Sequence, residues 1–309
     1  MLYTVTLNPA LDKTAQIDGF AVDQVNRIVS LRQDPGGKGI NVSKVAKKLG
    51  TPSKAYAIVA GATGEKISSM LADGGIELVA TAVEGETRTN LKVVDTKLGT
   101  NTDINEPGPE VVEDDVMRLT KALEKQVREG DVVVVSGSLP RGISPQTYAQ
   151  MTVVLKAAGA KVFVDADGEP LRIALKAHPS LIKPNDIELS RLLGKELHSA
   201  GEVAEAAQEL VAQGIETVVV SMGAQGAAFA RKGETLFAKA PKVKVGSTVG
   251  AGDSIVAAMA HAALTGLSFE ETARLAVATG SANVMCSGTQ PAEVEVIEEL
   301  SPKVSVERI

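Results

Sequence analysis

The chain has 309 residues, of which 44% are hydrophobic, so it is long enough to fold around one large core. Lys and Arg number 32 and Asp and Glu 38, which gives a net charge of −6, and only 3% of the residues are aromatic, with no tryptophan. This balance argues against nonspecific binding to nucleic acid or anionic membranes, and against base stacking on aromatic side chains. We therefore expect neither nucleic acid nor a membrane as a partner.

The cysteine content and the apolar stretches bear on location. Cys286 is the only cysteine, so an intrachain disulfide cannot form, which fits a reducing compartment. The first residues lack the basic-then-apolar pattern of a signal peptide. No apolar stretch approaches the roughly 18–20 residues of a membrane span. The sequence thus predicts a cytoplasmic protein.

Apolar strands and helical patterns alternate along most of the chain. Residues 2–7 read as a strand, and continuous apolar runs at 132–135, 162–164 and 217–220 are typical of parallel strands buried on both faces. Helical patterns lie between these runs, around residues 113–129, 144–158, 186–193 and 202–213. The alternation predicts an α/β fold, with a mainly parallel sheet and helices on both sides, in one domain over residues 1–309.

Two stretches near the front have a different pattern. Residues 12–33 and 86–105 mix Thr, Asn, Asp, Arg and Lys with Val, Ile and Leu, which predicts half-exposed antiparallel strands. Such separated segments cannot form a core of their own, so we expect a small sheet that projects from the main sheet as a lid. An apolar face on that lid would need covering, which favours a partner subunit.

A first glycine-rich turn, Gly36-Gly37-Lys38-Gly39, precedes Asn41 and a helix over 42–49. A phosphate or a sugar can approach a glycine backbone closely, and the Asn41 amide can both donate to hydroxyls and accept from them. The spacing is not that of a Walker A loop, and a plain helix-start turn explains the residues equally well.

A second motif runs from Lys183 to Glu188, after a predicted strand at 181–182. Asn185 and Glu188 are three residues apart and so share a helix face. An amide and a carboxylate placed there can hold a hydrated Mg²⁺ that faces nucleotide phosphates. The alternative is a capping box, with Asn185 as the N-cap and Glu188 three residues on.

A third turn contains Ser221, Gly223 and Gly226 and follows the apolar run at 217–220. Its glycines either lie flat against a nucleotide or merely join two strands. Arg27 and Arg88 fall within the predicted lid, where a guanidinium can bind a phosphate through two parallel hydrogen bonds.

The most informative segment is Thr248-Val249-Gly250-Ala251-Gly252-Asp253, followed at once by an apolar helical run over 255–264. A helix start offers unpaired N–H groups and the positive end of a dipole, and so attracts phosphate or a developing anion. A carboxylate at that place can take a proton from a hydroxyl while the amides stabilise the phosphoryl group. The alternative is that Asp253 is an ordinary helix cap.

Four motifs together resemble the PfkB/ribokinase family of sugar kinases. They are Asn8-Pro9-Ala10-Leu11-Asp12, Gly36-Gly37-Lys38-Gly39-Ile40-Asn41, Lys183-Pro184-Asn185 through Glu188, and Ser247-Thr248-Val249-Gly250-Ala251-Gly252-Asp253. Residues 25–27, 87–90, 103–109 and 136–140 are similar to those of the family's phosphosugar kinases, in particular the kinases of fructose 1-phosphate.

The resemblance implies a ribokinase-like three-layer α/β sandwich with a β-sheet lid, dimeric through the lids. It implies ATP with Mg²⁺ as the phosphoryl donor and the 6-hydroxyl of fructose 1-phosphate as the acceptor. Tagatose 6-phosphate and fructose 6-phosphate stay open as alternatives, because the same arginines can serve a phosphate at either end of a ketohexose. A sugar-phosphate sensor without turnover would need neither Asp253 nor the glycines beside it, so their presence argues against that class.

The resemblance also implies roles for individual residues. Asp253 would accept the proton, and Gly250, Ala251 and Gly252 would form the anion hole. The sugar phosphate would be bound by Asp12, Arg27, Gly37, Lys38, Asn41, Arg88 and Ser138. The nucleotide would be bound by Lys183, Asn185, Ser221, Gly223, Gly226, Thr248, Gly250 and Asn283. Asn185 and Glu188 would organise the metal through water.

Two features depart from the family pattern. Lys38 also occurs in kinases of unphosphorylated sugars, so it does not by itself indicate a phosphosugar. The stretch Asp165-Ala166-Asp167-Gly168 carries an acid where relatives often have Ser or Thr, which leaves the role of that acid open.

Overall fold

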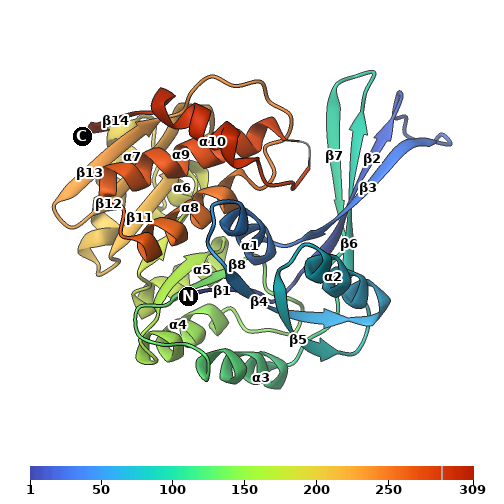
Figure 1. Cartoon of the computed structure of the whole chain (residues 1–309), viewed down its shortest axis with the longest axis horizontal. Coiled ribbons are helices and arrows are strands. Elements are labelled where there is room, and N and C mark those ends of the chain that lie inside the picture. Colours follow the sequence, from blue (N-terminus) through green and yellow to red (C-terminus); the bar gives the residue numbers. More distant parts are fainter. Residues whose placement is uncertain (287) are drawn as a thin grey trace.

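The computed structural model describes residues 1–286 and 288–309, and over these residues the chain forms a ten-stranded sheet and a separate four-stranded sheet. Helices cover both faces of the large sheet, and the small sheet projects from one end of the body (Figure 1). The predicted α/β class, with a mainly parallel central sheet and a smaller sheet beside it, is confirmed.

The large sheet places seven parallel strands beside a three-stranded antiparallel edge. The parallel strands are β1 (Leu2–Thr6), β4 (Ser53–Ala60), β5 (Glu77–Val83), β8 (Val132–Ser136), β9 (Lys161–Asp165), β10 (Leu181–Ile182) and β11 (Thr217–Ser221). The edge consists of β12 (Gly226–Arg231), β13 (Glu234–Lys239) and β14 (Ser305–Arg308). Their order is β14-β13-β12-β11-β10-β9-β8-β1-β4-β5.

The helices form the two outer layers. One face carries α1 (Lys38–Lys48), α2 (Gly61–Asp73), α8 (Ala251–Thr265), α9 (Phe269–Met285) and α10 (Val294–Leu300). The other face carries α3 (Glu113–Glu124), α4 (Thr147–Ala157), α5 (Gly168–Ala174), α6 (Asp186–Leu193) and α7 (Ala200–Ala212). Over the described ranges, no helix combines the length and the apolar character that a bilayer crossing requires.

The continuous apolar runs are explained by this layering. In β8, Val133 and Val135 pack against the core under α3 to α7, whereas Val132 and Val134 pack against the core under α8 and α9. Because successive side chains of a strand point to opposite faces, a strand covered on both sides needs an apolar residue at every position.

The small sheet is built from two hairpins. Its strands are β2 (Ala10–Ile17), β3 (Ile28–Gly36), β6 (Arg88–Asp95) and β7 (Thr100–Asn105), in the order β3-β2-β6-β7. The prediction of antiparallel strands is confirmed for the two hairpins, β2–β3 and β6–β7, and is wrong for β2 and β6, which pair in parallel. The chain leaves β3 for α1, β4, α2 and β5 and returns to β6 in the direction of β2, as a long crossover allows.

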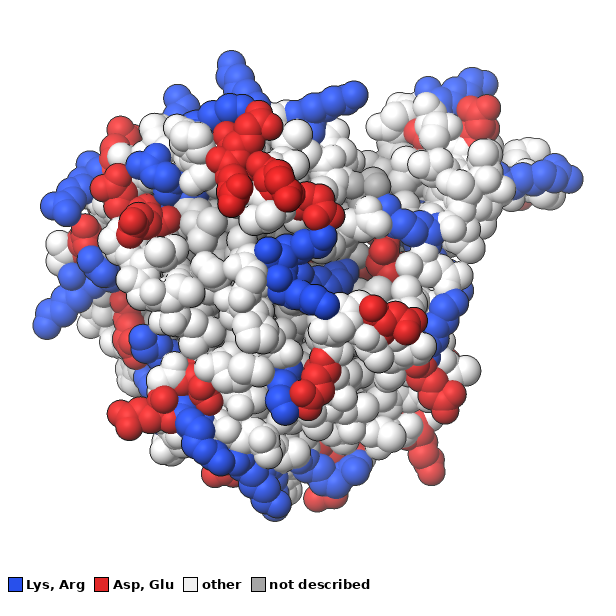
Figure 2. Space-filling model, in the orientation of Figure 1, with Lys and Arg blue, Asp and Glu red and all other residues white. Residues whose placement is uncertain are grey.

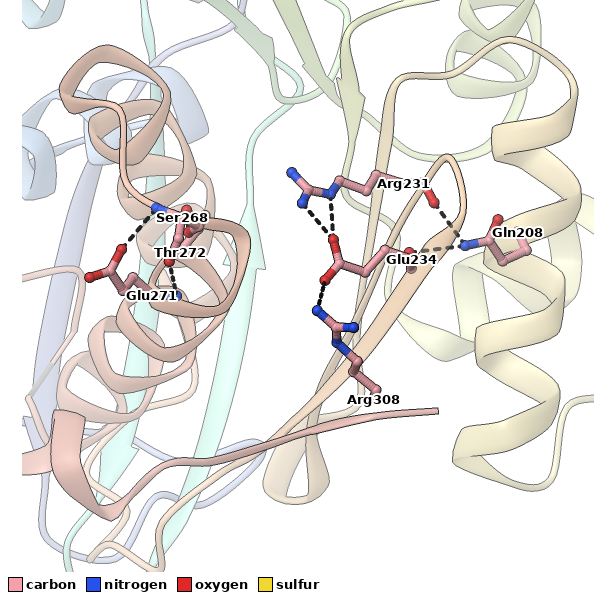
Figure 3. A network of polar contacts seen from close by, with 7 residues as sticks. All are labelled: Gln208, Arg231, Glu234, Ser268, Glu271, Thr272 and Arg308. Atoms are coloured by element: carbon pink, nitrogen blue, oxygen red, sulfur yellow. Dashed lines mark hydrogen bonds and ion pairs between the residues drawn. The ribbon is translucent and has the colours of Figure 1, made fainter.

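Charged residues form ion pairs across the strands at the edge of the large sheet that lies farthest from the small sheet (Figure 3). Glu234 accepts from Arg231 Nε at 2.8 Å and pairs with Arg308 of β14 at 3.1 Å. Gln208 of α7 donates to the backbone carbonyls of Arg231 and Glu234, at 2.9 and 3.1 Å. These contacts tie the last strand and a covering helix to one hairpin. Elsewhere on the face drawn in Figure 2, charges of both signs are interspersed.

The turn between β11 and β12 requires glycine at one position. Gly226 has φ 122°, and a Cβ there would lie 2.0 Å from the Ala238 carbonyl oxygen of the paired strand. We expect Gly226→Ala to lower the free energy of unfolding by at least about 2 kcal/mol, measured by urea denaturation. Gly223→Ala is the control, because Gly223 also has a positive φ but no atom within 4 Å of such a Cβ. Its cost should stay near about 1 kcal/mol, and equal losses would contradict the steric argument.

Candidate active site

A cavity of about 1150 Å³ lies at the carboxyl ends of the parallel strands and reaches the facing side of the small sheet. The sites predicted from separate motifs meet here, as expected for this edge of an open α/β sheet. The predicted residues that line it are Asp12, Gly37, Lys38, Asn41, Arg88, Ser138, Lys183, Asn185, Glu188, Ser221, Gly223, Gly226, Thr248, Gly250, Ala251, Gly252 and Asp253. Arg27 and Asn283 do not line it.

Asp253 occupies the first turn of α8, and its side chain is buried. The N-cap of α8 is Gly250, in a left-handed conformation with φ 84°, so the alternative that Asp253 caps the helix is wrong. Asn41 donates from Nδ2 to Asp253 Oδ2 at 2.8 Å and so orients the carboxylate. The first N–H groups of a helix have no intrahelical partner, so the start of α8 offers amide donors beside this carboxylate.

The surroundings of Asp253 weaken its acidity. Burial, together with the negative charge of Asp165, raises the pKa of Asp253 to about 6, against the opposing influence of Lys38, Asn41 and Lys183. A carboxylate with a pKa near the operating pH is a better proton acceptor than an ordinary aspartate. The group is thus suited to general base catalysis at neutral pH.

Two lysines share one buried carboxylate next to Asp253. Lys38 Nζ lies 3.0 Å from Asp165 Oδ1, and Lys183 Nζ lies 3.6 Å from the same oxygen. Burial alone would raise the pKa of Asp165, but the two ammonium groups outweigh it and hold that pKa below its ordinary value. The sequence places Asp165 at the end of a buried strand, within the stretch at 165–168, but no site role was predicted for it.

The small sheet supplies the opposite wall of the cavity. Asp12 of β2 accepts from Asn90 Nδ2 of β6 at 3.0 Å. Arg88 is held by three backbone carbonyls, those of Asn8, Pro9 and Glu106, at 3.0 to 3.5 Å. Further polar residues of the same face, for which the sequence predicted no site role of their own, line the cavity: Thr14, Asn90, Lys92, Asp103 and Asn105. Their alternate spacing along β2, β6 and β7 is the signal that would have found them.

Asn185 and Glu188 form a capping box and also line the cavity. Asn185 Oδ1 accepts from the Glu188 amide at 2.7 Å, and Glu188 Oε2 accepts from the Asn185 amide at 2.9 Å. Glu188 keeps its second oxygen, Oε1, for a ligand. The described residues include no cluster of three or more His, Cys, Asp or Glu able to hold a metal. One carboxylate oxygen fits Mg²⁺, which typically takes one or two carboxylates and completes its shell with water and phosphate.

The cavity lining also includes five valines, Val243, Val245, Val249, Val277 and Val284, together called the valine-lined slot. Their apolar side chains suit the flat face of a base.

The two predicted residues outside the cavity wall have different positions. Asn283 lies behind the wall, where it donates to the Gln290 carbonyl at 2.8 Å and supports Gly250, whose Cβ, if present, would be 3.2 Å from Asn283 Oδ1. Arg27 is exposed, in the segment between β2 and β3.

Comparison with known proteins gives a consistent family. The model of the family described as "pfkB family carbohydrate kinase" matches residues 5–295. The 1-phosphofructokinase of Bacillus subtilis (strain 168) is 38% identical over 311 residues, covering 100% of both chains. Among solved structures, phosphofructokinase-2 from Escherichia coli in complex with fructose-6-phosphate is similar with a TM-score of 0.92, at 33% identity over 98% of each chain.

A more distant structure has the same architecture. Arabidopsis thaliana ribokinase complexed with ribose and ATP is similar with a TM-score of 0.78, at 25% identity over 97% of this chain and 98% of that one. The predicted ribokinase-like fold and the predicted family resemblance are thereby confirmed. This chain belongs to the pfkB family of carbohydrate kinases.

Proposed function

We propose that this kinase transfers the γ-phosphoryl group of ATP to the 6-hydroxyl of fructose 1-phosphate and releases ADP and fructose 1,6-bisphosphate. The observation that carries the proposal is the position of Asp253 at the start of α8, beside two lysines, in a cavity whose other wall carries Arg88 and Lys92. The names of full-length relatives, such as the 1-phosphofructokinase of Bacillus subtilis, support this acceptor. The likeness to an enzyme complexed with fructose-6-phosphate keeps that sugar as the second candidate.

The acceptor sugar would bridge the two walls of the cavity. Asp12, Gly37 and Asn41 would hold its hydroxyls, and Arg88 and Lys92 would attract its phosphate, with Ser138 beside them. Lys38, predicted as a further phosphate ligand, pairs with Asp165 next to Asp253 and would lie at the other end of the sugar. Arg27 remains a predicted phosphate ligand that stands outside the cavity of the single chain. Contacts at the far end of the sugar would hold the attacking hydroxyl next to Asp253, so that the binding of the sugar also orients it for the reaction.

The reaction itself needs a proton acceptor and a site for negative charge. Asp253 takes the proton of the 6-hydroxyl while the oxygen forms a bond to the γ-phosphorus and the bond to the β-phosphate oxygen breaks. The amides of Gly250 to Asp253 and the Lys183 ammonium face the charge on the phosphoryl group. Because these donors are fixed before the substrates bind, little reorganisation is needed during the transfer.

The nucleotide would occupy the valine-lined slot, with Thr248 and the turn of Ser221, Gly223 and Gly226 along its sides. Asn185 and Glu188 would hold Mg²⁺, largely through water, and the ion would neutralise charge on the phosphates.

We further propose that the small sheet is a lid and that a second copy of the chain covers its outer face. The lid residues Ile28, Leu31 and Ile104 are 48–52% exposed, and Val25 and Val29 more than 70%. The sheet stands clear of the body in the space-filling view (Figure 2). A projecting sheet with exposed apolar side chains is typical of an interface.

The acceptor is tested by ADP release with fructose 1-phosphate, fructose 6-phosphate, tagatose 6-phosphate and fructose, each with Mg²⁺ and ATP. We expect kcat/KM to be at least ~10-fold higher for fructose 1-phosphate than for the others, which corresponds to about 1.4 kcal/mol in transition-state binding. A preference for a 6-phosphate would replace the acceptor and keep the mechanism. Binding of a sugar phosphate without turnover of any compound would favour the sensor.

The general base is tested by Asp253→Asn, which keeps the shape of the side chain and an oxygen that can accept from Asn41. We expect kcat to fall at least ~10²-fold while ATP binding is retained. In the wild type, kcat/KM should rise as the pH increases through about 6, because Asp253 acts only when ionised. A variant with near-wild-type kcat would remove Asp253 from this role.

The same variant should also change stability in a defined direction. The pKa of Asp253 is higher in the folded protein than its ordinary value of 3.8, so the folded state binds the proton more tightly. Stability is therefore lost as the pH rises from about 4 to about 6, and above that range Asp253→Asn should melt at a higher temperature than the wild type.

The dimer is tested by sedimentation equilibrium of the wild type and of Leu31→Glu, which places a charge on the outer face of the lid. We expect the wild type at twice the 32.0 kDa chain mass and the variant near one chain mass. Val153→Glu on α4, where Val153 is 59% exposed, is the matched control and should stay dimeric. A monomeric wild type would contradict the proposal.

A further inference from the structure

Asp165 is a buried carboxylate that the proposed mechanism does not yet use. It is the last residue of β9, and its side chain is 2% exposed. Oδ1 accepts from Lys38 Nζ at 3.0 Å and pairs with Lys183 Nζ at 3.6 Å. Oδ2 is buried and finds no hydrogen-bond partner among the described residues. Both lysines therefore contact the Asp165 carboxylate through the same oxygen, Oδ1.

The two lysines come from opposite sides of the site. Lys38 is the first residue of α1 and follows the glycine turn that would hold the sugar. Lys183 follows β10, two residues before Asn185 on the nucleotide side. Lys183 Nζ also approaches the anion hole, because a Cβ at Gly252 would lie only 3.1 Å from it. Asp165 thus joins the acceptor half of the cavity to the donor half, next to the start of α8.

The charges in this cluster change during the proton transfer that the proposed function requires. With Asp253 ionised, the two lysines and the two aspartates sum to zero. When Asp253 takes the hydroxyl proton, the cluster becomes positive by one charge, while the phosphoryl group is between donor and acceptor. A positive charge that arises at this moment stabilises the transition state more than the bound substrates, which is the condition for catalysis.

We propose that Asp165 is a positioning residue, which rests on the proposed kinase function: it holds the ammonium groups of Lys38 and Lys183 on the two sides of the phosphoryl group in transfer. Without it, the buried ammonium group of Lys183 and the partly exposed one of Lys38 would face each other with no shared counter-charge and would move apart. The loss would affect the rate of transfer more than the binding of either substrate, because the fold of the two binding walls does not depend on Asp165.

The test is Asp165→Asn, which keeps the volume and an accepting oxygen but removes the charge. We expect kcat to fall at least ~10-fold, with KM for ATP and for the sugar phosphate changed less than ~3-fold. In a plot of kcat/KM against pH, the rise on the acid side should also move to lower pH. Asp253 is faced by Lys38 and Lys44 of α1, by Asp165 of β9 and by Lys183 after β10, and the variant removes the one charge among these that raises its pKa. A purely structural role of Asp165 would reduce the amount of folded enzyme without moving that rise.

Asp167→Asn is the matched control on the same loop. Asp167 is exposed, does not line the cavity and accepts only from the Gly168 amide as the N-cap of α5, a role that asparagine fills equally well. It should keep wild-type kinetics, which would also answer what the acid at this position does.

Three results would overturn the proposal. The first is a folded Asp165→Asn variant whose kcat equals that of the wild type. This result counts only if the wild type turns over the sugar phosphate, so that the kinase function itself is established. The second is recovery of the lost rate by higher Mg²⁺, which would make Asp165 a metal ligand. If the single variant does not fold, the double variant Asp165→Asn with Lys183→Met takes its place, because it also removes the unpaired ammonium group. A kcat of that double variant equal to the wild-type kcat is the third result.

Discussion

Four charged side chains at one edge of a parallel sheet, three of them buried and the fourth, Lys38, partly exposed, set the requirements for the rest of this molecule. Lys38, Asp165, Lys183 and Asp253 lie within one cavity wall, and each would be costly to remove from water alone. They are tolerated because each lysine has the Asp165 carboxylate as a counter-charge, and Asp253 has the Asn41 amide. Such a cluster keeps its geometry only if the backbone that carries it cannot relax.

The layered core supplies that rigidity. β9 lies between β8 and β10 and is covered on both faces, so Asp165 extends from a strand that has no freedom to move. α8 packs against α9 and α1, which fixes the start of α8 beside the same edge. The small sheet is different, because it is anchored at one end and exposed over much of its surface. The fold thus combines a cavity wall held between two helical layers with a second wall that projects from the body.

The sequence was most informative where a local pattern favours one structure. The valine run at 132–135 is a strand covered on both faces, as predicted, and the segment from Gly250 to Asp253 begins a helix, as predicted, although the N-cap is Gly250 and not Asp253. The fold class and most of the cavity wall followed from such segments. At Asn185 and Glu188 the capping box is confirmed, and it uses only one carboxylate oxygen of Glu188, so the metal-binding interpretation stays a prediction.

What the sequence could not predict depends on contacts between distant residues. Lys38 and Asp165 are 127 positions apart in the sequence, so no pattern of neighbouring residues predicts their contact. The parallel pairing of β2 with β6 depends on the path of the chain through α1, β4, α2 and β5 rather than on either strand. Arg27 shows the same limit, because its residue type suits a phosphate but its segment leaves it exposed in the single chain.

The raised pKa of Asp253 links this architecture to its chemistry. Burial favours the protonated carboxyl, so keeping Asp253 ionised at neutral pH costs folding free energy. The same raised pKa suits Asp253 to the proposed role of proton acceptor, since an oxygen that favours binding a proton accepts one from a hydroxyl more readily. Lys38 and Lys183 oppose the shift and so favour the ionised carboxylate that the proposed role requires. Burial and Asp165 raise the pKa of Asp253 while the two lysines lower it, and the proposed base depends on this balance.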